Sequence, residues 1–160
     1  MAVLPILPAD SARVRQRSKR VTSIDGSVLR LVDDMVDTMR DAPGVGLAAI
    51  QIGVPLRVVV IEVPEQDPMV LINPQVVKRS GEREVDEGCL CLPGYRGKLR
   101  RSVSVTVKGK DIQGKEVRIK AEGLLAQALE HEIDHLNGVL YIDHLESPDQ
   151  LHRIEEPGED

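Results

Sequence analysis

The sequence predicts an α+β fold in which antiparallel sheets pack around a C-terminal helix. Two observations predict this class: helical periodicity near both ends of the chain, and alternating or β-branched segments between them. The length of 160 residues fits one hydrophobic core. We therefore expect a single compact domain at residues 1–154, followed at residues 155–160 by a flexible acidic tail.

The first long element is expected to be an amphipathic helix. Its apolar residues recur at helical spacing and comprise Val28, Leu31, Val32, Met35, Val36 and Met39. Asp25 or Ser27 is the expected N-cap, and Pro43 with Gly44 marks the end of the helix.

Five segments have the composition of strands. A short one is expected at residues 3–7, and two β-branched ones at residues 56–63 and 69–72, the last ended by an Asn-Pro pair. Residues 103–107 and 116–120 alternate along their length and are separated by a glycine-containing turn. This pair predicts a β-hairpin.

The last helix is expected at residues 122–137, with Gly138 at its end. Its polar stripe comprises Gln127, Glu130, Asp134 and Asn137, and its apolar stripe comprises Leu125, Leu129 and Leu136. The histidines of this helix fall between the two stripes, in line with Leu124 and Ala128. They are therefore expected where the core meets a cleft.

This helix carries an H-E-x-x-H pattern from His131 to His135. Two imidazoles four residues apart share one helix face and can bind one metal ion, and Glu132 lies within reach of a water on that ion. The pattern has only five residues, so it also occurs by chance on ordinary helix surfaces. His144 and His152 have no such spacing and are expected at the surface.

A third metal ligand is expected in the segment from Glu87 to Cys91. Cys89 can supply a thiolate, and Gly88 lets the backbone approach closely. One cysteine with two histidines leaves a coordination position open, as in catalytic zinc sites. In the alternative, Cys91 also binds and the site is a closed structural zinc centre. Two cysteines one residue apart exclude a disulfide framework.

A glycine-rich segment spans residues 44–53 and contains one polar amide, Gln51. It lacks the Gly-Lys-Ser/Thr sequence of a phosphate-binding loop. A plain turn between helix and strand is the simpler alternative.

Composition and charge exclude several functions. With two tyrosines and neither Phe nor Trp, the chain lacks an aromatic surface for single-stranded nucleic acid. The formal net charge of -5 opposes binding to phosphate backbones. Apolar runs long enough for a membrane span or a secretory signal are missing, so we expect no membrane partner and a cytoplasmic location.

Together, the three motif segments resemble the peptide deformylase family, which carries G-[VI]-G-L-A-A-P-Q-x-G, E-G-C-[LV]-S and Q-H-E-x-D-H-L-x-G in this order. The chain departs from these patterns with Ile50 for Pro, Cys91 for Ser and Glu130 for Gln. The second departure puts an extra thiol near the metal, where it could compete as a ligand or form a disulfide.

The resemblance implies metal-dependent removal of the N-formyl group from the formylmethionine of nascent polypeptides, with release of formate. Cys89, His131 and His135 would hold one divalent metal, ferrous iron in the cell, with zinc or nickel also tolerated. Glu132 would act as general base and acid, and Gln51 with the Leu90 backbone N–H would stabilise the oxyanion. The implied substrate contacts are Val45, Gly46, Glu87, Gly88, Leu124 and Ala128.

The implied partner is an N-formylmethionyl peptide, with transient proximity to the ribosome. Docking through a basic C-terminal helix is not expected, because the chain ends in acidic residues. Two other functions stay open at this point: an H-E-x-x-H endopeptidase and a non-catalytic zinc-binding module.

Overall fold

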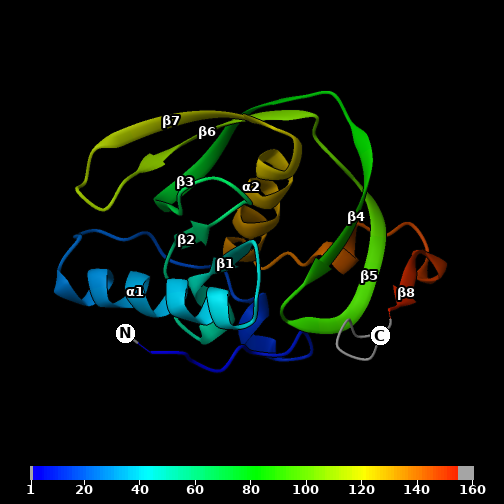
Figure 1. The fold of residues 1–160 in the computed structure, drawn as a ribbon, viewed down its shortest axis with the longest axis horizontal. Coiled ribbons are helices and arrows are strands. Elements are labelled where there is room, and N and C mark those ends of the chain that lie inside the picture. Colours follow the sequence, from blue (N-terminus) through cyan, green and yellow to red (C-terminus); the bar gives the residue numbers. More distant parts are fainter. Residues whose placement is uncertain (1, 155–160) are drawn as a thin grey trace.

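Two antiparallel sheets and two α-helices form the framework of the computed structural model, which describes residues 2–154 (Figure 1). One sheet has five strands in the order β1-β2-β3-β6-β7, and the other has three in the order β4-β5-β8. The strands are β1 (Gly46–Ala48), β2 (Val58–Ile61), β3 (Met69–Ser80), β4 (Arg83–Cys89), β5 (Leu92–Arg101), β6 (Ser104–Lys110), β7 (Glu116–Glu122) and β8 (Leu151–Arg153). The predicted fold class is confirmed.

The helices are α1 (Gly26–Asp41) and α2 (Gly123–Leu136). Asp25 is the N-cap of α1, since its carboxylate accepts hydrogen bonds from the backbone N–H groups of Ser27 and Val28 at 3.0 and 3.2 Å. Gly138 follows α2 with a φ of 77°, and a Cβ there would lie 2.3 Å from the carbonyl oxygen of Arg15. Both the backbone conformation and the close contact therefore require glycine.

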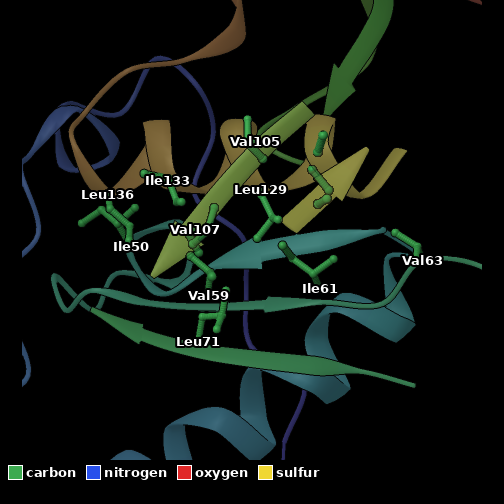
Figure 2. Packing of buried hydrophobic residues seen from close by; sticks show 14 residues of the cluster. Ile50, Val59, Ile61, Val63, Leu71, Val105, Val107, Leu129, Ile133 and Leu136 are labelled. Carbon is green, nitrogen blue, oxygen red and sulfur yellow. The ribbon is translucent and has the colours of Figure 1, made fainter. Parts of the chain in front are cut away.

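The five-stranded sheet lies between the two helices, and its faces bury different side chains. Val58 and Val60 of β2 pack with Met35 of α1, whereas Val59 and Ile61 pack on the opposite face with residues of α2. Figure 2 shows the second cluster, in which Leu129, Ile133 and Leu136 of α2 point toward the strands. Burial on both faces explains why β2 is a continuous apolar run.

Two sequence predictions about strands are wrong. The Asn-Pro pair does not end β3, which continues to Ser80 through a register shift between Ile72 and Gln75. Asn73 adopts a φ of 54°. Its side-chain amide accepts a hydrogen bond from the Val21 N–H at 2.8 Å and donates one to the Val21 carbonyl at 2.9 Å. A β-bulge held by tertiary hydrogen bonds thus replaces the expected chain break.

Residues 3–7 also do not form a strand. The Leu4 N–H donates to the hydroxyl of Thr38 at 2.9 Å, and the Leu7 N–H donates to the Gln51 carbonyl at 2.7 Å. These bonds tie the segment to two separate elements instead of one ladder.

The predicted polar stripe of α2 is also wrong at Glu130, which is buried. Its carboxylate accepts hydrogen bonds from the N–H and hydroxyl of Ser102 at 2.8 and 2.9 Å, and from Arg79 Nε at 3.0 Å. Ser102, which directly follows β5, and Arg79 of β3 therefore cover a helix face that the sequence pattern assigns to solvent.

β4 and β5 form a long hairpin that the sequence did not predict. It curves away from the five-stranded sheet on the far side of α2 (Figure 1), with β8 paired to the edge of β5. As a result, α2 lies between the two sheets. Among the helices that the structure describes, none has the length and apolarity required to cross a bilayer. The expected tail at residues 155–160 lies outside the described residues.

Candidate active site

A cleft of about 320 Å³ opens between α2, the glycine-rich segment and the hairpin of β4 and β5. The predicted site residues that line it are Val45, Gly46, Gln51, Glu87, Gly88, Cys89, Leu90, Leu124, Ala128, His131 and Glu132. Three segments that are far apart in the sequence therefore share one cavity.

Three potential metal ligands converge at this cleft. The ligand atoms of Cys89, His131 and His135 all lie within 4.8 Å of one another. His135 Nε2 is 3.2 Å from Cys89 Sγ and 3.1 Å from His131 Nε2. The histidines come from successive turns of α2, and the cysteine comes from the end of β4. Helix spacing alone places the two histidines together, and the hairpin of β4 and β5 positions the cysteine beside them.

The separations and chemistry of these donors fit a divalent metal ion. Bonds of about 2.0–2.3 Å place ligands of a tetrahedral zinc ion roughly 3.3–3.6 Å apart, near the two separations measured from His135 Nε2. One thiolate and two imidazoles form a borderline-soft set that suits zinc, iron or nickel. Burial, followed by the proximity of His131, lowers the pKa of His135 well below its usual value, which favours the neutral, metal-binding imidazole.

Glu87 fixes the orientation of His131. Its carboxylate accepts a hydrogen bond from His131 Nδ1, and it is held from behind by Arg101 Nε at 3.0 Å and Nη2 at 2.6 Å. Burial alone would raise the pKa of Glu87, but its bonds to His131 and Arg101 lower it to about 2. Glu87 is therefore an anion in contact with His131, and it also lines the cleft, where it was expected as a substrate contact.

The second thiol, Cys91, does not join the convergent group. Its Sγ is 3.0 Å from Cys89 Sγ, but within residues 2–154 the group is made up of Cys89, His131 and His135. Cys91 packs behind the site against Val14 and Leu140 and is 2% exposed. This placement favours three protein ligands and an open position over a closed four-ligand centre.

Glu132 presents an unpaired carboxyl group beside these donors. Its Oε1 is buried and has no hydrogen-bond partner among the described residues. Burial raises the pKa of Glu132 to about 7, although the nearby His131 opposes the shift. A Cβ on Gly46 would lie 2.7 Å from its Oε2. Gly46 therefore provides the space that this carboxyl group occupies.

Gln51 and Leu90 also line the cleft. The Ala48 N–H donates to Gln51 Oε1 at 2.8 Å, which turns Nε2 toward Cys89, 3.6 Å from its Sγ. Leu90 occupies the turn between β4 and β5 and lines the cleft. The amide NH₂ of Gln51 is thereby held as a donor facing the cleft.

All six expected substrate contacts line the cleft, and among them Leu124 is 45% exposed. Gly88 lies beside the backbone of the hairpin, where a Cβ would be 3.2 Å from the Tyr95 carbonyl oxygen. Among the described strands β1 lies at the edge of its sheet, so none of them pairs with one side of its backbone.

Sequence reasoning missed several residues that support the site. Arg101 is buried and joins Glu87 to Asp134, whose carboxylate also contacts His144 Nε2 at 2.8 Å. The Tyr141 ring stacks on His131 with centroids 6.2 Å apart. Arg101 ends the segment 98–101, in which three of the four residues are basic, so no local signal marked it as buried. His144 is partly exposed, as expected.

Comparisons with known proteins decide the family. A model of the polypeptide deformylase family matches residues 3–151. The chain belongs to this family. It is 54% identical over 155 residues to a peptide deformylase of Dehalococcoides mccartyi strain CBDB1, an alignment that covers 96% of this chain and 93% of the relative. It is 51% identical over 150 residues to a peptide deformylase of Rhizobium meliloti, covering 91% and 86%.

Solved deformylase structures share the fold. A crystal structure from Legionella pneumophila has a TM-score of 0.89 at 47% identity and covers 93% of this chain and 89% of its own. A deformylase from Synechococcus elongatus, crystallised with actinonin, has a TM-score of 0.89 at 39% identity, covering 92% and 81%. Deformylases are metal-dependent hydrolases that remove the N-formyl group from nascent peptides, so the chain is an enzyme of this class.

Proposed function

We propose that Cys89, His131 and His135 hold the catalytic metal of this deformylase, and that Glu132 moves the proton during hydrolysis of the formamide bond. The observation that carries this proposal is the convergence of the three donors beside an unpaired, buried carboxyl group. A divalent ion at these donors supplies Lewis acidity toward the formyl oxygen and lowers the pKa of water.

Glu132 accepts the proton of the attacking water and delivers it to the departing amine. Its buried Oε1 has no hydrogen-bond partner among the described residues, so the carboxyl group is free to take up and release a proton. Gln51 Nε2 and the Leu90 N–H donate hydrogen bonds to the oxyanion of the tetrahedral intermediate. Because Gln51 Oε1 is already held by Ala48, its amide needs little reorganisation during the reaction.

The peptide binds as an extra strand along the open edge of β1, with its backbone against Val45 and Gly46. The methionine side chain enters the cleft near Leu124 and Ala128. Actinonin, which is bound in the Synechococcus elongatus structure, is expected to compete for this cleft.

We also propose ferrous iron as the metal in the cell, with zinc or nickel also accepted by the same donors. Divalent affinity generally favours zinc over iron, so metal supply decides which ion is bound. A substrate on nascent chains implies a cytoplasmic enzyme with transient ribosome proximity.

Formate release tests this function directly. Protein purified without oxygen is analysed for metal and assayed with a formyl-methionyl peptide and with the matched acetyl-methionyl peptide. We expect formate from the first peptide and negligible acetate from the second, with loss of activity after chelation. Cleavage at an internal peptide bond would instead support an endopeptidase.

A further inference from the structure

The Cys91 thiol has no part in the proposed hydrolysis, yet it touches a metal ligand. Its Sγ lies 3.0 Å from Cys89 Sγ, and both cysteines are free thiols. A disulfide bond is about 2.05 Å long, so the two sulfurs need to approach by roughly 1 Å. Such a movement is within the reach of side-chain rotation in a turn.

The hairpin turn directs both thiols to the same side. Cys89 pairs with Leu92 across β4 and β5, so Leu90 and Cys91 form a two-residue turn. The Cys91 N–H also donates to Cys89 Sγ at 3.5 Å. The sulfur contact is therefore built into the local backbone.

The two thiols differ in access. Cys89 lines the cleft, whereas Cys91 is 2% exposed and packs against Val14 and Leu140. A small oxidant entering the cleft meets Cys89 first. Cys91 lies directly behind it, in the position of a resolving thiol.

We propose that Cys89 and Cys91 form a site of reversible oxidative modification, in which a hydroperoxide oxidises metal-free Cys89 and Cys91 then closes a disulfide with it. The inference rests on the proposed function only where Cys89 is taken as a metal ligand. The disulfide and the metal are mutually exclusive states of one sulfur.

The chemistry balances with hydrogen peroxide as the oxidant. Cys89 sulfur attacks one peroxide oxygen, the O–O bond breaks, and a sulfenic acid and one water form. Cys91 sulfur then attacks the sulfenic sulfur, the S–O bond breaks, and a second water leaves. Two thiols lose two hydrogens, and one peroxide is reduced to two waters.

The consequence is protection of the metal site. Without a neighbouring thiol, an oxidised cysteine proceeds to sulfinic and sulfonic acids, which ordinary thiols do not reduce. Closure of the disulfide stops this progression, and a dithiol reductant restores both thiols. Bound metal holds Cys89 and is expected to slow its oxidation.

The test compares metal-free wild-type protein with Cys91→Ser and Cys91→Ala after exposure to hydrogen peroxide. We expect the wild type to lose both free thiols and two hydrogens in its intact mass, with full recovery in dithiothreitol. The variants should gain oxygen atoms without recovery. Wild-type protein that gains oxygens as the variants do, or that forms disulfide-linked dimers, would overturn the proposal.

A zinc-loaded arm tests the exclusion between metal and disulfide. Zinc should slow thiol loss in the wild type, and the oxidised protein should fail to bind zinc until it is reduced. A disulfide-bonded protein that still binds one zinc would overturn the exclusion. Formate release by the reduced, loaded enzyme is measured separately, so failure of this inference and failure of the proposed function are distinguishable.

Discussion

Glu87 accepts a hydrogen bond from His131 Nδ1, and this contact determines which ring nitrogen faces the metal site. Because Nδ1 donates its proton, Nε2 keeps a lone pair directed toward His135 Nε2, 3.1 Å away. Arg101 holds the carboxylate in place through two hydrogen bonds. The sheet β4-β5-β8 thus orients a histidine of α2 that we propose as a metal ligand.

Replacing Glu87 with Gln is expected to weaken metal binding about 10- to 100-fold, the usual cost of losing such a carboxylate partner. The Gln amide has the shape of the carboxylate but carries no negative charge, so it holds His131 and Arg101 less strongly. Zinc competition titration measures the effect, with Glu84→Gln on the exposed face of β4 as the matched control. Equal zinc affinity in Glu87→Gln and wild type would contradict the role of Glu87.

The bonds of Glu87 to His131 and Arg101 should also make stability depend on pH in the metal-free protein. The pKa of Glu87 falls from 4.5 to about 2 on folding, so its contribution is present above pH 4.5 and is lost as the pH falls toward 2. The shift corresponds to roughly 3 kcal/mol at 1.36 kcal/mol per unit.

Urea unfolding at several pH values checks this dependence. The difference in unfolding free energy between wild type and Glu87→Gln should be largest near neutral pH. It should shrink below pH 4.5, as the wild-type carboxyl group becomes protonated. A difference that stays constant through this range would contradict the assignment.

Glu132→Gln is expected to retain the metal and lose at least about 100-fold in kcat, because an amide cannot move the proton. Metal content and formate release are measured on the same preparation. Turnover near the wild-type rate would show that another group transfers the proton.

Gln51 offers a matched pair of variants. Gln51→Glu preserves the acceptor for the Ala48 N–H but removes the donor, whereas Gln51→Ala removes both. If oxyanion stabilisation is its role, both variants should lower kcat by about 100- to 1,000-fold, whatever the order of their thermal stabilities. If kcat instead falls in proportion to the loss of thermal stability in the two variants, Gln51 has a purely structural role.

Gly46→Ala tests the space reserved for Glu132. The added methyl would lie 2.7 Å from Glu132 Oε2, so the carboxyl group must move. We expect kcat to fall with little change in metal content. Gly26→Ala, whose nearest neighbour is the flexible side chain of Arg30, is the control and should behave as wild type. Unchanged kcat in Gly46→Ala would place the working position of Glu132 elsewhere.

Periodicity in the sequence predicted the elements whose burial follows a simple pattern. Both helices, β2 and the hairpin of β6 and β7 have regular apolar spacing or β-branched runs, and the structure contains all of them. The sequence narrowed the N-cap of α1 to Asp25 or Ser27, because capping depends on neighbouring residues alone, and the structure shows Asp25.

The hairpin of β4 and β5 escaped prediction because it buries charges. Glu87 and Arg101 take inward positions that alternation normally assigns to apolar side chains, and they neutralise each other only after folding. The same reason hides Glu130, whose partner Ser102 lies 28 residues earlier in the chain. Motif reading pointed to Cys89, His131 and His135 together, but their distances and the placement of Cys91 depend on this hairpin.

X-ray absorption at the zinc edge of the zinc-loaded enzyme tests the metal site most directly. We predict one sulfur ligand at about 2.3 Å and lighter nitrogen or oxygen ligands at about 2.0–2.1 Å. The spectrum should be unchanged in Cys91→Ser and should lose its sulfur contribution in Cys89→Ser. Two sulfur ligands in the wild type, with one lost in Cys91→Ser, would contradict a three-ligand open site.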